Sequence, residues 1–184
     1  MGAFVDRQCK EIVSTGHSLG PSSDAEEHGS ALARSKPFRQ VGALPWRFSK
    51  SGSLRIMLIT SSSGRHWIIP KGWPVTGKSE FDSAAQEALE EAGVIGRVAA
   101  IPIGEFEFAK SADPQSARRV RVYPLEVRGT LVRWQEWEKR KRRWFSVNEA
   151  VEAVHNAQLA AVIKGYSMAK IQLISNNYPD FGLK

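Results

Sequence analysis

Residues 67–94 read WIIPKGWPVTGKSEFDSAAQEALEEAGV, and this stretch decides the fold class. Its apolar start predicts a short strand that its proline ends, since proline cannot donate a hydrogen bond to a sheet. A loop rich in glycine and proline follows, and then a helix that begins near Ser79 and ends near Ala92. Ser79 with Asp82 three residues later is typical of a helix start, and Gly93 suits the left-handed residue that ends a helix. The stretch therefore predicts a strand, a loop and a helix in direct succession.

Three glutamates of this helix, Glu87, Glu90 and Glu91, lie three and four residues apart. At about 100° per residue they fall within an arc of roughly 100° on one face of the helix. Like charges placed in this way repel and weaken the helix unless cations neutralise them. Hard divalent cations such as Mg²⁺ or Mn²⁺ are the natural partners of clustered carboxylate oxygens. The face is therefore a candidate metal site, and a merely solvated acidic face is the alternative.

The same stretch resembles the box of the Nudix hydrolases, which reads Gly, five residues, Glu, seven residues, Arg-Glu-apolar-x-Glu-Glu-x-Gly-apolar. Laid on this sequence, the box starts at Gly72 and ends at Val94 in register. The resemblance implies an α/β protein with a Nudix-type α/β/α sandwich and a mixed sheet. It also implies a catalytic centre in which Glu87 and Glu91 are metal ligands, helped by the backbone carbonyl of Lys71. Glu90 would be a further ligand or the catalytic base, and the cofactor would be Mg²⁺ or Mn²⁺.

Two positions depart from the box. Lys78 stands where the family has its first glutamate, and Gln86 stands where it has arginine. In the family these two residues support the loop and the helix by pairing with each other and with the neighbouring glutamates. The departures leave the metal-binding carboxylates in place but remove both partners of the support. A Nudix-like module that binds a phosphorylated metabolite or RNA and cuts only weakly is therefore the alternative to an enzyme.

The resemblance extends to one branch of the family. Residues 61–70 and 137–150 look like the diphosphoinositol polyphosphate and diadenosine polyphosphate phosphohydrolases, and together the similar parts cover roughly residues 39–163. This branch implies hydrolysis of a diphosphate linkage, a phosphoanhydride, in a nucleoside-polyphosphate or diphosphoinositol-polyphosphate type of substrate.

The charge of the chain also points to an anionic partner. The 184 residues carry a formal net charge of +7, and residues 110–143 hold eleven Lys or Arg against four Asp or Glu, which accounts for the whole excess. A polyphosphorylated small molecule is the expected partner, and nucleic acid is the second choice. The candidate substrate-binding residues are Arg47, Ser61, Ser62, Ser63, Arg65, Gly72, Arg118, Arg119, Arg121, Arg140, Lys141 and Arg142.

The rest of the chain predicts one domain at residues 38–184 after a flexible leader at 1–37, which is rich in Ser, Gly, Asp and Glu. Strands are expected near 40–48, 54–60, 98–103, 105–108, 120–127 and 143–145, with an irregularity or a sheet edge at Pro124. A final helix is expected at about 147–168, with an interruption near 155–156. A single cysteine, Cys9, and the lack of an export signal or membrane span favour the cytoplasm. The oligomeric state stays open.

Overall fold

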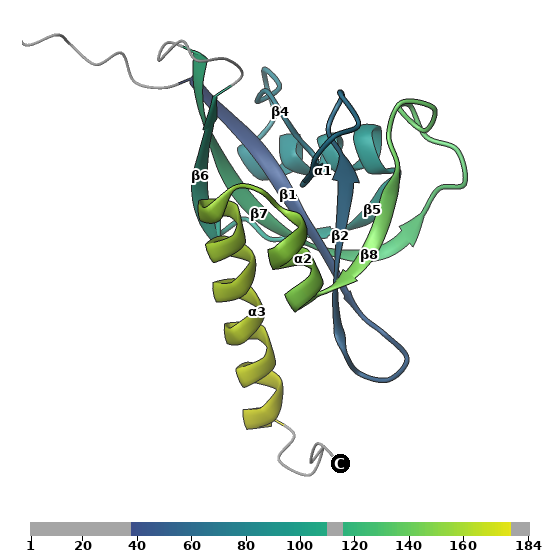
Figure 1. The fold of residues 1–184 in the computed structure, drawn as a ribbon, viewed down its shortest axis with the longest axis vertical. Helices are drawn as coiled ribbons and strands as arrows, with labels where there is room; N and C mark the ends of the chain where they lie inside the picture. Colours follow the sequence, from purple (N-terminus) through teal and green to yellow (C-terminus); the bar gives the residue numbers. More distant parts are fainter. Residues whose placement is uncertain (1–37, 110–115, 178–184) are drawn as a thin grey trace, which may run out of the picture. The chain divides into compact units, whose positions relative to one another are not determined.

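The computed structural model describes residues 38–109 and 116–177. The predicted leader at 1–37 lies outside the described residues, as do Lys110 and Asp113 of the basic segment. Within the described part, four strands precede a first helix, four more strands follow it, and two helices come last (Figure 1).

The strands of the described part form one mixed sheet of eight strands. Their bounds are β1 Phe38–Phe48, β2 Leu54–Thr60, β3 Trp67–Ile68, β4 Lys71–Gly72, β5 Val94–Val98, β6 Gly104–Ala109, β7 Ala117–Thr130 and β8 Arg142–Ser146. The main path runs β3-β2-β1-β7-β5, while β4 pairs with β1, β6 with β7, and β8 with β2. Only the β1–β7 pair is parallel within this sheet of described residues.

Helices cover both faces of this sheet (Figure 1). On one face, α1 (Glu80–Ala92) packs its alanines against the side chains of β1, β2 and β7. On the other face, α2 (Val147–Ala153) and α3 (Ala157–Asn177) cover a second core that includes Leu44 and Phe106. The expected α/β/α sandwich with a mixed sheet is therefore confirmed. No helix in the described ranges combines the length and the apolar character that a bilayer crossing requires.

The ends of the helices follow the local signals in the sequence. Ser79 accepts a hydrogen bond from the backbone N–H of Asp82 at 3.1 Å, and Gly93 adopts a φ of 61° at the end of α1. Ser146 begins α2 with a complete capping box formed with Glu149. The predicted interruption near 155–156 is confirmed, because Asn156 accepts a hydrogen bond from the N–H of Leu159 and so starts a new helix.

Two predicted boundaries are wrong, and the structure decides between the two alternatives at Pro124. A strand begins at Val94 and ends at Val98, rather than running from 98 to 103, because Gly93 turns the chain directly from α1 into β5. Pro124 lies inside β7 and pairs with Leu44 of β1. On its other side the partner of β7 changes from β6, which pairs up to Val122, to β5, which pairs from Leu125, so Pro124 marks the predicted irregularity and not a sheet edge. Its carbonyl still accepts a hydrogen bond from Ala99 N at 3.0 Å. The last helix continues to Asn177, beyond the expected end near 168.

Candidate active site

The loop before α1 is held against the centre of the sheet. Strand β4 pairs with β1 through the partners Val41 with Gly72 and Gly42 with Lys71. A Cβ atom at Gly72 would lie 2.0 Å from Oε1 of Glu87, far inside van der Waals contact. A side chain at this position would displace the Glu87 carboxylate, which packs directly on the backbone of Gly72.

The Glu87 carboxylate lies in an acidic and half-buried environment. Burial raises its pKa to about 7, and the charges of Glu91, Glu90 and Glu136 add to the rise, while Lys71 opposes it. Each of these neighbours except Lys71 disfavours a negative charge on Glu87. A bound cation would remove this repulsion, so the electrostatics of the face suit a cation.

Glu91 has two protein partners. One oxygen accepts a hydrogen bond from the backbone N–H of Lys71 at 3.0 Å, and the other forms an ion pair with the guanidinium of Arg140. The side chains of Glu91 and Arg140 are each only 9% exposed. Arg140 also donates to Glu136 and, at 3.0 Å, to the carbonyl oxygen of Thr60. Glu91 and Arg140 therefore tie α1 to the end of β2 and to the segment before β8.

The two residues that depart from the box, Lys78 and Gln86, form a chain of hydrogen bonds that ends on Glu90. Lys78 Nζ donates to Gln86 Oε1 at 2.8 Å, and Gln86 Nε2 donates to Glu90 Oε1 at 2.7 Å. The charged pair of the family is thus replaced by a hydrogen-bonded chain that starts at a lysine and ends on a carboxylate. Lys78 and Gln86 still support each other and Glu90, although with different chemistry.

The donor set fits a hard divalent cation by its chemistry. Glu87, Glu90 and Glu91 share one face of α1, where Glu87 packs on Gly72 and Glu91 accepts a hydrogen bond from the backbone N–H of Lys71. Within the described ranges, no three Asp, Glu, His or Cys side chains are already gathered as metal ligands. The oxygens of Glu91 are directed to Arg140 and to the Lys71 amide, and one oxygen of Glu90 is directed to Gln86. Ligation would therefore require some of these carboxylates to exchange a protein partner for the ion.

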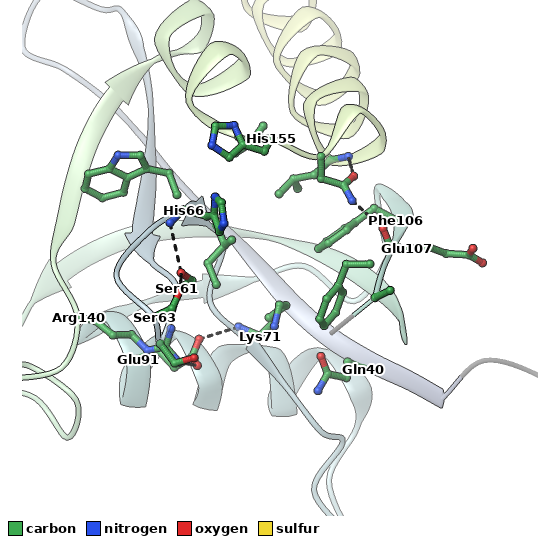
Figure 2. Close-up of a pocket in the computed structure, with 18 residues that line it drawn as sticks. Gln40, Ser61, Ser63, His66, Lys71, Glu91, Phe106, Glu107, Arg140 and His155 are labelled. Atoms are coloured by element: carbon green, nitrogen blue, oxygen red, sulfur yellow. Dashed lines mark hydrogen bonds and ion pairs between the residues drawn. The ribbon is translucent and has the colours of Figure 1, made fainter. Parts of the chain in front are cut away.

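A cavity of about 890 Å³ opens beside Glu91 (Figure 2). Glu91, Lys71, Arg140 and residues Ser61–Ser63 line its polar end. The other end is built from β3, β6 and the junction between α2 and α3. The side chains there are mostly apolar or aromatic, namely Trp67, Ile68, Phe106, Phe108, Val154 and Leu159. The cavity therefore joins a charged end to an aromatic end.

The structure brings only part of the predicted phosphate-binding set to this cavity. Ser61, Ser62, Ser63 and Arg140 line it, and Gly72 borders Glu87. Among the described residues, Arg47 and Arg65 lie outside the lining, and Arg47 stacks on Trp144 at 4.0 Å. Their role in binding substrate stays a prediction.

The arginines of β7 face acidic residues of other elements. Arg119 pairs with Glu107 at 2.7 Å, and Arg121 pairs with Glu105 at 2.9 Å and with Glu80 at 2.8 Å. Hydrogen bonds from Tyr123 and then from Arg121, with the charge of Arg121, lower the pKa of Glu80. Much of the positive charge on β7 is therefore matched by carboxylates of α1 and β6.

Lys141 and Arg142, which stand just before and at the start of β8, mainly contact backbone atoms. Arg142 donates to the carbonyl oxygens of Ala92 and Leu131, and its guanidinium stacks on Trp134 at 4.1 Å. Lys141 joins β2 through hydrogen bonds of its backbone with Thr60. Arg118 lies 5.7 Å from the ring of Trp73. In this structure Arg142 completes the C-terminal end of α1, and its contact with phosphate stays a prediction, as do those of Arg118, Arg119, Arg121 and Lys141.

Sequence reasoning missed several residues of the site. Glu136 adds a fourth carboxylate near Glu87, and Gln40 of β1 lines the cavity. His66 and His155 form an edge-to-face pair with ring centroids 4.8 Å apart at its rim. These residues come from four separate segments and follow no common spacing, so the sequence holds no signal that would have grouped them.

Comparison with known proteins agrees with this geometry. Residues 36–166 match the NUDIX domain family. The chain is 34% identical over 148 residues to "Nudix hydrolase 16, mitochondrial" of Arabidopsis thaliana, covering 76% of this chain and 82% of that protein. It is 33% identical over 102 residues to the human "Diphosphoinositol polyphosphate phosphohydrolase 3-alpha", covering 54% of this chain and 59% of that one.

The fold also matches solved structures. The binary complex of the C. elegans Ap4A hydrolase aligns with a TM-score of 0.60 at 17% identity, over 73% of this chain and 98% of that one. At this identity the likeness concerns the fold alone. The family match covers the sheet, α1 and the three glutamates together, and it includes the glycine against which Glu87 packs. This chain therefore belongs to the Nudix hydrolase family.

Proposed function

We propose that this Nudix hydrolase cleaves a phosphoanhydride bond in a nucleoside-polyphosphate or diphosphoinositol-polyphosphate type of substrate, with the help of Mg²⁺ or Mn²⁺. The observation that carries the proposal is the position of Glu87, Glu90 and Glu91. Glu87 packs on the Gly72 backbone, Glu91 lines the charged end of a cavity of about 890 Å³, and Glu90 lies on the same helix face, where its charge acts on Glu87. A cavity of this size accommodates a metabolite rather than a small ion alone.

Each residue of the charged end has a role in this proposal. Glu87, Glu90, Glu91 and the Lys71 carbonyl would hold the ion. When bound, the ion would neutralise phosphate charge and activate a water molecule for attack on phosphorus. The hydroxyls of Ser61–Ser63 and the ammonium of Lys71 line the same space and would bind phosphate oxygens by donating hydrogen bonds to them.

The relatives support the same reaction class. The name of the human relative refers to a diphosphoinositol polyphosphate, and that of the C. elegans structure refers to Ap4A. Both names describe substrates with phosphoanhydride bonds among several phosphates. The basic and hydroxyl groups at the charged end of the cavity suit either of them.

The test is phosphate release from a panel of diadenosine polyphosphates, diphosphoinositol phosphates, nucleotide sugars and nucleoside triphosphates, with Mg²⁺, Mn²⁺ or EDTA. Glu90→Gln serves as the inactive variant because it retains the length of the side chain next to Gln86. Glu152→Gln, an exposed change on α2, is the matched control.

We expect metal-dependent release from one class of substrate, lost in Glu90→Gln and retained in Glu152→Gln. Binding of a panel member without any release, in all metal conditions, would contradict the proposal and favour a module that binds but does not cut.

A further inference from the structure

The aromatic end of the cavity contains a buried polar atom for which no described residue supplies a hydrogen bond. The side chain of Gln40 is almost fully buried, at 6% exposure of the residue, and it lines the cavity. Its Oε1 atom has no hydrogen-bond partner within the part of the chain that the structure describes. A buried acceptor left unpaired is costly, so an atom of this kind indicates a ligand or a water molecule that donates to it.

Gln40 lies on the same face of the sheet as the aromatic side chains of the cavity. It pairs in register with Val120 of β7, and Val120 pairs in register with Phe106 of β6. Registered neighbours point to the same side of a sheet, and Phe108 follows Phe106 at the two-residue spacing that keeps it on that side. Two strand spacings place the backbones of Gln40 and Phe106 about 10 Å apart. The amide and the two rings therefore border one space, and Figure 2 labels Gln40 and Phe106 there.

Lys71 joins this space to the charged end. Its ammonium lies 4.3 Å from the centroid of the Phe108 ring, and its backbone N–H donates to Glu91. Consider a molecule that extends from the carboxylates of α1 to Gln40. Its phosphates would lie near Lys71, and the group at its other end would lie at the aromatic end of the cavity.

The chemistry of the aromatic end determines which group of a substrate can bind there. Phosphate oxygens are acceptors at neutral pH, so they cannot donate to Gln40 Oε1, and Phe106 and Phe108 offer them nothing. A nucleobase with an amino group supplies an N–H donor at its edge and a flat face for contact with an aromatic ring. A densely phosphorylated inositol has neither of these.

We propose that Gln40, Phe106 and Phe108 form a subsite for an amino-bearing nucleobase, so that the substrate of this hydrolase is a nucleoside polyphosphate rather than a diphosphoinositol polyphosphate. This inference rests on the proposed function and chooses between its two substrate classes.

The test is calorimetric binding of three ligands in the presence of Mg²⁺: AMP, purine riboside 5′-monophosphate, which lacks the amino group, and ribose 5-phosphate, which lacks the base. None of them contains a phosphoanhydride bond, so binding is measured without turnover. The variant is Gln40→Met, which retains the shape of the side chain but loses the acceptor. The control is Gln172→Met, a change of the same kind at an exposed position of α3.

We expect the wild type to bind AMP more tightly than either analogue. In Gln40→Met the Kd for AMP should rise about three- to tenfold, as the loss of one neutral hydrogen bond predicts. The Kd values for the two analogues should change less than twofold in that variant, and Gln172→Met should match the wild type for all three ligands.

Three results would overturn the inference. AMP could bind no more tightly than ribose 5-phosphate, or Gln40→Met could leave AMP binding unchanged, or it could weaken both nucleotides equally, which would place the contact at the sugar.

A thermal scan adds an independent check. Because Gln40→Met removes an unpaired buried acceptor, the ligand-free Tm should stay equal or rise, and a fall of more than about 3 °C would mean that Oε1 has a structural partner.

The two proposals fail separately. Selective AMP binding without phosphate release from any panel member would remove the proposed hydrolysis and leave the nucleobase subsite. Metal-dependent release from diphosphoinositol phosphates, together with equal binding of AMP and ribose 5-phosphate, would retain the hydrolysis and remove the subsite.

Discussion

Replacing Glu87 with glutamine should stabilise the metal-free protein at alkaline pH and leave it unchanged at acidic pH. The pKa of Glu87 is raised from its ordinary value of 4.5 to about 7, with burial as the largest cause and the charges of Glu91, Glu90 and Glu136 next. The folded protein therefore holds this proton more tightly than the unfolded chain does. The resulting stabilisation is complete below about pH 4.5 and is lost as the pH rises through 7.

The size of the effect follows from the shift. Each pKa unit corresponds to about 1.4 kcal/mol, so the ionised Glu87 would cost up to about 3 kcal/mol at pH 8. Because the side chain is partly reached by solvent, we expect about 2 kcal/mol. Near pH 4.5 the cost is below about 0.5 kcal/mol, since the carboxyl is protonated in the folded protein and half protonated in the unfolded chain.

The assay is urea unfolding of the wild type, Glu87→Gln and Glu152→Gln in EDTA at pH 4.5 and pH 8. Glu87→Gln should raise the free energy of unfolding by about 2 kcal/mol at pH 8 and by less than about 0.5 kcal/mol at pH 4.5. The exposed control should show no such difference between the two values of pH. Adding Mg²⁺ at pH 8 should stabilise the wild type more than Glu87→Gln. An equal effect of Glu87→Gln at both values of pH, or a loss of stability at pH 8, would refute the reasoning.

Three further changes test other contacts of the site. Gly72→Ala should lower kcat/KM at least about tenfold, because its Cβ would overlap the carboxylate of Glu87. Gly129→Ala is the control, since no atom lies within 4 Å of the added Cβ, and it should leave kcat/KM unchanged in the same assay. Arg140→Met should lower the free energy of unfolding by about 3 kcal/mol in urea, because it leaves the buried carboxylate of Glu91 without its counter-charge; a loss below about 1 kcal/mol would contradict the ion pair. Gln86→Met should lower kcat about two- to tenfold with little change in Tm, because it removes the 2.7 Å hydrogen bond that orients Glu90, and an unchanged kcat would show that this bond is dispensable.

The parts of the fold that the sequence predicts well are those with local signals. Ser79 and Gly93 mark both ends of α1, and the three- and four-residue spacing of the glutamates places them on one face without knowledge of any other element. The need for Gly72 follows from the family box, and the close approach of Glu87 supplies the physical reason for it.

The parts that the sequence does not predict depend on contacts between distant segments. Glu91 and Arg140 are 49 residues apart, and nothing near either residue indicates that they pair. From the sequence alone Glu87 and Glu91 are equivalent targets for mutation, whereas in the structure Glu91 also holds the β8 region to α1. A change at Glu91 therefore affects stability together with activity.

The basic segment shows the same limit of sequence reasoning. Counted along the chain, residues 110–143 carry all of the excess charge. In the structure Arg119 and Arg121 meet carboxylates at Glu80, Glu105 and Glu107, which lie outside that segment. A local count of charges therefore overstates the positive surface that remains for an anionic partner.

The most direct test of the central claim is the rate of phosphate release from diadenosine tetraphosphate as a function of Mg²⁺ concentration, compared between the wild type and Glu90→Gln. We predict that the rate of the wild type rises with Mg²⁺ to saturation and falls to background in EDTA. Glu90→Gln should fold normally and remain at least about a hundredfold slower at every concentration of Mg²⁺. A Glu90→Gln variant with the turnover of the wild type, or a wild-type rate that does not respond to Mg²⁺ and EDTA, would contradict the assignment of this glutamate face as the catalytic metal site.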